Sequence, residues 1–277
     1  MIKRIIFHLI IFFLSINIEI IGQGNCLEDT VQTSIIQDIN HCFNDGIKLI
    51  HSPSNLTGKD WIYFGGIIGI TSGSFFIDKS IKNTVAKNHN ETMDDFTKIG
   101  EYYGSAQYMI LLSGAAYLTG KVLGNNEISE TGRELLETLA YAGIITTVFK
   151  VGFGRARPYL NKGAFDFFNF SFKDDYLSFP SGHVTVAFAI SSVLAAKIEN
   201  LYASIALYGL AGLTMYQRIY ANRHWFSDTF LSAAISTVIG NAIVKYNECP
   251  DKSNKISLMI LPYVQLHSTG LGLVFTF

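Results

Sequence analysis

Six apolar segments follow one another along most of the chain and limit the folds open to it. They span 61–77, 105–120, 135–149, 183–196, 201–217 and 229–244. Their lengths suit helices, and Gly, Ala, Ser and Thr run through them without the alternation of polar and apolar positions that marks a half-buried strand. The pattern predicts an all-α bundle with six core helices.

The sequence leaves open whether these helices cross a membrane. Charged residues make up 16% of the 277 residues, below the roughly 25% usual in soluble domains, which favours membrane contact. Each apolar segment is, however, shorter than the about 20 residues that a span needs, and Glu137 interrupts the third. The net charge of −1 excludes a strong field that would attract nucleic acid.

The N-terminal part of the chain differs from the bundle. Residues 1–24 have a short basic start followed by an apolar run, and they predict an export signal, with an uncleaved anchor as the alternative. Residues 25–60 predict a helical extension, in which an amphipathic helix covers 29–45. Its apolar stripe contains Ile35, Ile36, Ile39, Cys42 and Phe43.

The C-terminal extension, residues 246–277, changes character again. Apolar side chains alternate with small or polar ones near its end, and Ser268-Thr269-Gly270 offers a turn after the run that ends at Leu266. The pattern predicts a short β-hairpin that accompanies the bundle.

Three short motifs carry the polar residues that could act on a substrate. The first places Lys150, Arg155 and Arg157 at the end of the third apolar segment, where Pro158 ends any helix. Cations at a helix C-terminus are common, so this cluster alone indicates no function.

The second motif is Pro180-Ser181-Gly182-His183, at the start of the fourth apolar segment. Ser is a favoured N-cap residue, and the free amides of a first helical turn attract an anion. His183 is therefore predicted to lie at the mouth of an anion site.

The third motif contains Arg218, His224 and Asp228. A spacing of four places the histidine and the aspartate on one face of a helix, where the carboxylate can fix the imidazole tautomer. Arg218 could offer a two-pronged hydrogen bond to a phosphate. Together the three motifs favour a single oxyanion site.

In this order the motifs read Lys-x6-Arg-Pro, Pro-Ser-Gly-His and Arg-x5-His-x3-Asp. They resemble the signature of the type 2 phosphatidic acid phosphatase (PAP2) family, which is similar in site and fold to the vanadium haloperoxidases. The resemblance covers roughly residues 60–245, so that 61–245 is predicted to be the phosphatase domain. Gln217 departs from the family, which often has Ser at this position.

The resemblance implies a phosphatase that needs no metal or other cofactor. His224 would attack phosphorus, oriented by Asp228, and form a phosphohistidine, while His183 would protonate the leaving oxygen. The implied phosphate-binding residues are Lys150, Arg157, Ser181, Gly182 and Arg218. Arg155 and Arg223 match no fixed family position and are interpreted as surface or secondary charges.

The implied substrates are phosphate esters or diphosphates of lipids, such as phosphatidate or a polyprenyl diphosphate. The alternatives are a vanadate-dependent haloperoxidase, an acid phosphatase acting on small esters, and a non-catalytic protein with a vestigial site. The Phe-rich segment 159–179 is either a lip that admits a lipid tail or a lid packed on the bundle. The predicted location is exported, in the periplasm or on a membrane.

Overall fold

The computed structural model describes residues 35–87, 89–248, 257–265 and 268–276. The predicted export signal lies outside these ranges. The described helices are α2 (Ile35–His51), α3 (Gly58–Ser74), α4 (Asp78–Ala86), α5 (Glu91–Tyr103), α6 (Ala106–Leu123), α7 (Asn126–Phe153), α8 (Gly182–Ile198), α9 (Leu201–Tyr220) and α10 (Phe226–Asn247). Short 3-10 turns cover Ser52–Asn55, Pro158–Leu160 and Asp174–Tyr176.

The bundle confirms the predicted all-α class. The six apolar segments fall on α3, α6, α7, α8, α9 and α10, whereas α4 and α5 were not predicted. Both of these helices are amphipathic but mostly polar, and neither contains a continuous apolar run, which explains why the apolar segments did not reveal them.

Several helices extend well beyond their apolar segments. α7 contains 28 residues, because polar residues form its first two turns. The side chain of Asn125 caps its start by accepting a hydrogen bond from the Ile128 amide, and Gly154 ends it at φ 57°. Among the described helices, α7 and α10 are long and apolar enough to cross a membrane, a property shared with core helices of soluble proteins.

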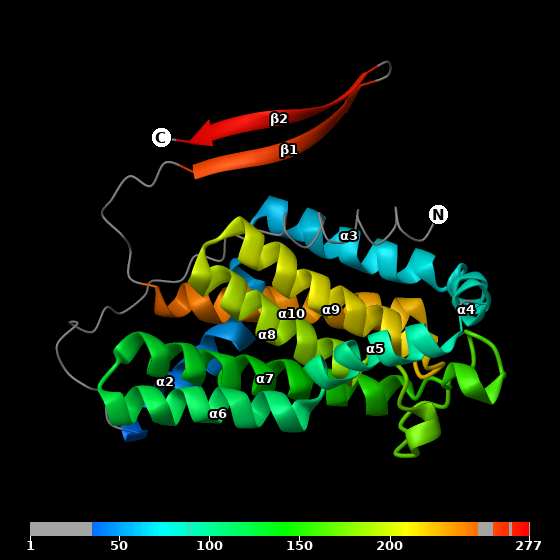
Figure 1. Ribbon diagram of the computed structural model, residues 1–277, viewed down its shortest axis with the longest axis horizontal. Helices are drawn as coiled ribbons and strands as arrows, with labels where there is room; N and C mark the ends of the chain where they lie inside the picture. The colour runs from blue at the N-terminus through cyan, green and yellow to red at the C-terminus, as the bar shows by residue number, and fades with distance from the viewer. Residues whose placement is uncertain (1–34, 88, 249–256, 266–267, 277) are drawn as a thin grey trace.

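α10 lies at the centre of the bundle and packs against α7, α8 and α9 (Figure 1). Small residues on α10 allow this close approach. A Cβ atom on Gly240 would lie 2.0 Å from Ser192 Oγ, so the small Ser192 side chain of α8 packs directly on the α10 backbone there. Phe230, Ala233 and Ala234 of α10 join the main apolar core.

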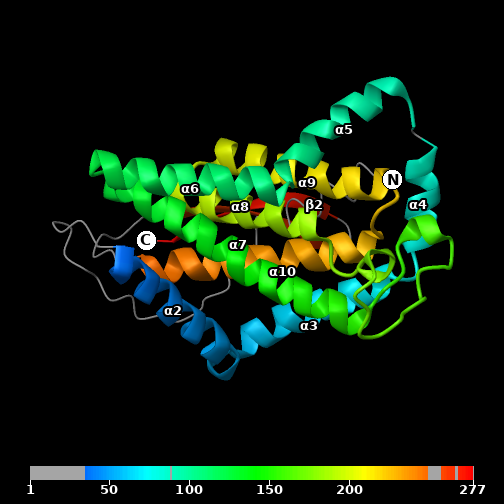
Figure 2. The same ribbon diagram turned by 90° about the horizontal axis from the view of Figure 1, so that it is seen from below.

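α2 turns its polar face inward and its apolar stripe outward. It runs along one side of the bundle (Figure 2), where Asp38 and Asp45 are buried. Tyr117 donates a hydrogen bond to Asp38, and Asn247 donates one to Asp45. The stripe residues Ile35, Ile36, Ile39 and Phe43 are between 51% and 72% exposed.

The same inverted pattern covers other outer helices. Large apolar side chains are exposed along α3 and α6, while acidic residues such as Glu134 and Glu137 of α7 are buried. The exposed set on α3 and α6 contains Trp61, Ile62, Tyr63, Phe64, Ile68, Ile70, Tyr108, Ile110, Leu111, Leu112, Leu118, Val122 and Leu123. An apolar outer surface of this extent is typical of proteins that contact lipid.

Two antiparallel strands follow the bundle: β1 (Ser257–Gln265) and β2 (Ser268–Thr276). Ser257 pairs with Thr276 at one end of the ladder, and Gln265 pairs with Ser268 at the other. The predicted turn residues Ser268-Thr269-Gly270 therefore lie in β2 rather than between the strands.

Replacing Gly120 by Ala should lower the midpoint of thermal unfolding. The new Cβ atom would lie 2.2 Å from the Ser129 backbone nitrogen and force α6 away from α7. Overpacking of this kind costs about 1–3 kcal/mol. Gly114→Ala on the same helix is the matched control, because no atom lies within 4 Å of its Cβ position, and it should stabilise the helix by about 0.5–1 kcal/mol. Equal shifts for both variants would contradict this packing.

Candidate active site

The three motifs meet at one end of the bundle, beside α4 and the loop that joins α7 to α8 (Figure 1). The first motif ends α7, the second begins α8, and the third links α9 to α10. Lys150, Arg157 and Arg218 all lie close enough to act electrostatically on both His183 and His224. The structure therefore brings the predicted site residues together.

His224 is buried, and its Nδ1 atom lies 2.7 Å from the carbonyl oxygen of Ser178. A carbonyl oxygen only accepts hydrogen bonds, so Nδ1 carries the proton and the lone pair of Nε2 remains unprotonated. The carboxylate of Asp228, which the sequence predicted as the orienting group, lies farther away, at 3.6 Å.

Ser178 connects this carboxylate to the histidine. Its hydroxyl donates to Asp228 Oδ2 at 2.5 Å, while its carbonyl oxygen accepts a hydrogen bond from His224 Nδ1. The Trp225 amide donates to the same carboxylate oxygen at 2.8 Å. Asp228 therefore acts on His224 largely by fixing Ser178. Sequence reasoning missed Ser178, because 46 residues separate it from the histidine.

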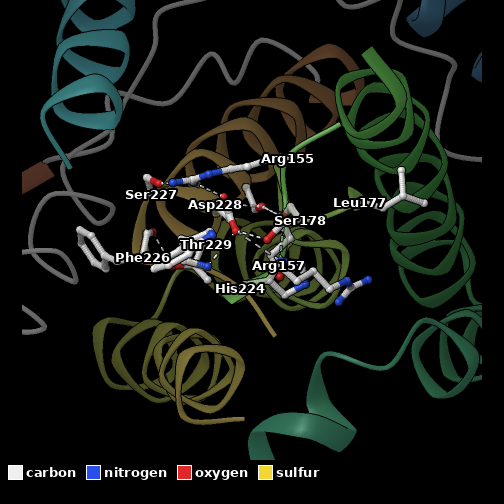
Figure 3. A network of polar contacts seen from close by, with 12 residues as sticks. Arg155, Arg157, Leu177, Ser178, His224, Phe226, Ser227, Asp228 and Thr229 are labelled. Atoms are coloured by element: carbon white, nitrogen blue, oxygen red, sulfur yellow. Dashed lines mark hydrogen bonds and ion pairs between the residues drawn. The ribbon is translucent and has the colours of Figure 1, made fainter. Parts of the chain in front are cut away.

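Arg155 is fully buried beneath this group, and its interpretation as a surface charge is wrong. Its guanidinium group donates to Asp228 at 2.5 Å and to Asp78 at 2.7 Å. It also bonds the Ser227 hydroxyl at 2.6 Å and the Ala164 carbonyl oxygen at 2.9 Å. Figure 3 shows this side chain lying across Ser227 and Asp228.

Asp78 brings α4 into the same network. One of its oxygens accepts a hydrogen bond from the Ser227 amide at 2.9 Å, and the other binds Arg155 and the Ser227 hydroxyl. The ring of Phe75 lies 4.1 Å from the Arg155 guanidinium carbon and shields it from water. A buried cation between two carboxylates satisfies charges that would otherwise be costly to bury.

Each of the three cations predicted to bind phosphate forms a hydrogen bond or ion pair with an oxygen atom of the protein. Lys150 donates to the carbonyl oxygen of Leu177 at 2.6 Å. Arg157 binds Asp174 at 2.8 Å, and Arg218 binds Glu101 at 3.1 Å. These oxygens keep the three cations near one another at the site entrance.

Ser181 is the N-cap residue of α8, as its sequence position predicted. Its amide donates to the Ser232 hydroxyl at 2.6 Å, so this amide is already used within the protein. The Ser181 hydroxyl is buried and has no hydrogen-bond partner in the part of the chain that the structure describes. A Cβ atom on Gly182 would lie 3.8 Å from Lys150 Cε, which places the first turn of α8 beside that lysine.

The environment keeps both histidines neutral. Burial and the charges of Lys150 and Arg157 hold the pKa of His224 well below its usual range. Burial and the charge of Arg218 lower the pKa of His183 to about 4. A neutral imidazole is the form that can act as a nucleophile.

Comparison with known proteins points to the same kind of site. Residues 132–248 match the family model described as the PAP2 superfamily. This segment, which makes up less than half of the chain, resembles PAP2 superfamily domains. The match includes all three motifs and runs from the first third of α7 to the end of α10.

One curated relative of the chain is a lipid A 1-phosphatase of Porphyromonas gingivalis. It is 31% identical over 104 residues, which are 37% of this chain and 20% of the relative. The chain spans between 44% and 49% of the length of three further lipid A phosphatases that it matches.

Two solved structures share the fold. Aquifex aeolicus LpxE is 25% identical, with a TM-score of 0.51, and the match covers 61% of this chain and 96% of LpxE. A transmembrane PAP2-type phosphatidylglycerolphosphate phosphatase from Bacillus subtilis is 16% identical, with a TM-score of 0.50 over 79% of this chain and 99% of that chain. The second likeness shows the fold alone.

The Phe-rich segment has two parts. Phe167 and Phe179 pack against the ring of Phe75, with centroid distances of 6.1 and 5.6 Å, and lie near the Arg155 guanidinium group, whereas Phe165 contacts Phe75 but is itself 60% exposed. Phe170 and Phe172 point outward and are 78% and 82% exposed. The inner part is a lid on the bundle, as one of the two interpretations predicted.

An apolar groove of about 640 Å³ leads to the site between α6, α7 and α8. Side chains such as Ile110, Ile144 and Val186 line its length, and Lys150 and His183 lie at its polar end. An apolar cavity that ends in a few polar groups is the usual form of a ligand site.

Replacing Arg155 by Met should destabilise the protein strongly. The change leaves Asp78 and Asp228 buried without their cation, and breaking such a pair costs about 3–5 kcal/mol. Chemical denaturation measures the loss. Lys162→Met is the control, because this exposed lysine contacts Tyr176 and its loss should change stability by under about 0.5 kcal/mol. A similar small effect for Arg155→Met would contradict the network.

Proposed function

We propose that this chain is a membrane-associated, metal-independent phosphatase that hydrolyses the phosphate esters of lipids through a phosphohistidine at His224. The observation that carries the proposal is the buried, neutral His224, whose Nε2 is unprotonated, next to three cations. The match of residues 132–248 to the PAP2 superfamily model and the similarity of the chain to lipid A phosphatases support the same activity.

The phosphate would bind between the three cations and the start of α8. Lys150, Arg157 and Arg218 would neutralise the charge on its equatorial oxygens. The buried Ser181 hydroxyl, which lacks a partner among the described residues, would donate a further hydrogen bond. Gly182 permits the first turn of α8 to approach the anion closely.

In the first step, His224 Nε2 would bond to phosphorus while the bond from phosphorus to the leaving oxygen breaks. His183 would give its proton to that oxygen. The pKa of His183 is about 4 in the ligand-free site, and a bound phosphate dianion would raise it towards the range that an acid needs.

In the second step, water would attack the phosphohistidine. His183, now neutral, would take a proton from this water as the phosphorus–nitrogen bond breaks and orthophosphate leaves. Asp228 and Ser178 would hold the His224 ring in place throughout, because Ser178 keeps its contacts to both residues.

The apolar groove supports a lipid as the substrate. Its walls suit an acyl chain, and its end at Lys150 and His183 would place the attached phosphate at the site. The apolar outer faces of α2, α3 and α6 would hold the enzyme in the lipid that contains the substrate. Phosphatidate, polyprenyl diphosphate and lipid A are the first substrates to test, the last because relatives are named as lipid A phosphatases.

Phosphate release from a lipid phosphate should continue in excess EDTA and disappear in His224→Ala, because the nucleophile is a side chain and no step uses a metal. The measurement is orthophosphate release by purified protein, with ³²P-labelled substrate to trap the phosphoenzyme. Release that depends on a metal, or that persists in His224→Ala, would sink the proposed mechanism.

Replacing Gly143 by Leu should reduce kcat/KM for a lipid phosphate by about tenfold, which corresponds to about 1.4 kcal/mol, while a small aromatic phosphate is hydrolysed as before. The reason is that Gly143 lines the groove and has open space at its Cβ position. Gly209→Leu is the matched control on α9, where the Cβ position is also open. Equal losses on both substrates would show that the lipid tail binds elsewhere.

A further inference from the structure

Glu101 reaches the site from α5, a helix outside the three motifs. Two glycines allow α5 to approach so closely. A Cβ atom on Gly100 would lie 2.8 Å from the backbone carbonyl of Leu213, and one on Gly104 would lie 2.8 Å from the carbonyl oxygen of His183. Glu101, between them in sequence, is therefore held against the end of α9 and the start of α8.

The Glu101 carboxylate forms a closed ring of contacts with two neighbours. Arg218 binds one of its oxygens at 3.1 Å, and the Gln217 amide nitrogen donates to the other at 3.4 Å. The Gln217 side-chain oxygen in turn accepts a hydrogen bond from Arg218 Nε. Gln217 is the residue at which the third motif departs from the family pattern, so this departure has a structural role.

Glu101 lies on the His183 side of the site. Its negative charge raises the pKa of His183, against the larger lowering effects of burial and Arg218. Its side chain is 50% exposed, so a ligand that binds beside His183 and Arg218 can reach it from solvent. In the proposed reaction, His183 is the group that meets the leaving oxygen.

We infer that Glu101 is a specificity residue, which selects phosphate monoesters over diphosphates. The inference rests on the proposed function. A monoester places an uncharged, hydroxyl-bearing or glycerol-like group beside the carboxylate, which can accept hydrogen bonds from it. A diphosphate would place its second phosphate there, and two like charges at contact repel each other.

The other charges around the site do not cancel this effect. Asp174 binds Arg157 from the loop side and is 73% exposed, so solvent screens it more strongly. Lys150, Arg157 and Arg223 add positive charge that attracts monoesters and diphosphates alike. Glu101 is the carboxylate that binds Arg218 directly, beside the proposed leaving group.

Binding of two non-hydrolysable ligands tests the inference without turnover. Methylphosphonate represents a monoester, and methylenediphosphonate represents a diphosphate; calorimetry on the full-length protein in detergent gives each Kd. Glu101→Gln should lower the Kd of methylenediphosphonate by a factor at least five times larger than its effect on the Kd of methylphosphonate. Glu91→Gln is the matched control, because it removes the same charge from the opposite end of α5 and should leave the ratio of the two Kd values unchanged.

The outcomes separate the inference from the proposed function. If the wild type binds both ligands but Glu101→Gln leaves their ratio unchanged, the specificity role is wrong and the phosphate site stands. If the wild type binds neither ligand, the phosphate site itself fails, and the inference fails with it. If Glu91→Gln shifts the ratio as much as Glu101→Gln, the effect is one of overall charge, which also overturns the inference.

Discussion

The buried guanidinium of Arg155 is the contact on which the site end of the bundle depends. It joins Asp78 of α4 to Asp228 of α10 and also bonds the loop between α7 and α8. Three segments that are far apart in the chain are therefore joined by hydrogen bonds and ion pairs to the same buried guanidinium group. Because an unpaired carboxylate in this position would be costly, the network forces α4, the loop and α10 into a single arrangement. The position of His224 follows from it, since Asp228 holds Ser178 and Ser178 holds the imidazole.

In the outer helices of the bundle, several polar side chains are buried and many large apolar side chains are exposed, the reverse of the pattern in most soluble proteins. Acidic residues such as Asp38 and Asp45 of α2 face inward and pair with neighbouring helices, whereas the isoleucines of the same helix face outward. Small residues on α8 and α10 bring the central helices close enough for this interior to form. A lipid can therefore contact two apolar surfaces of the protein. One is the outer surface, and the other is the groove between α6, α7 and α8 that leads to the site.

Without a ligand, the three cations of the site bind oxygens of the protein itself. The acceptors are the Leu177 carbonyl oxygen and the carboxylates of Asp174 and Glu101. A phosphate would exchange these contacts for its own oxygens, so the affinity of the site depends on the difference between two sets of charge-assisted hydrogen bonds. One acceptor is a neutral carbonyl oxygen and two are carboxylates. A bound phosphate therefore meets negative protein charge beside two of the three cations, which makes its affinity depend on its own charge.

The sequence alone determined the all-α class, the apolar segments of the core helices and the resemblance of the motif-bearing segment to PAP2 proteins, because apolar runs and motif spacing are local properties. It also predicted that Lys150, His183 and His224 would gather at one anion site, and the structure brings them together. It did not reveal that Arg155 is buried, that the Ser178 carbonyl oxygen accepts a hydrogen bond from His224 or that Glu101 binds Arg218. Those contacts join residues that are 77, 46 and 117 positions apart. The packing of α4 and α5 onto the bundle decided the first and third of these contacts, and the fold of the loop between α7 and α8 decided the second. α4 and α5 have mostly polar sequences, and short helices of this kind are stabilised chiefly by the elements against which they pack.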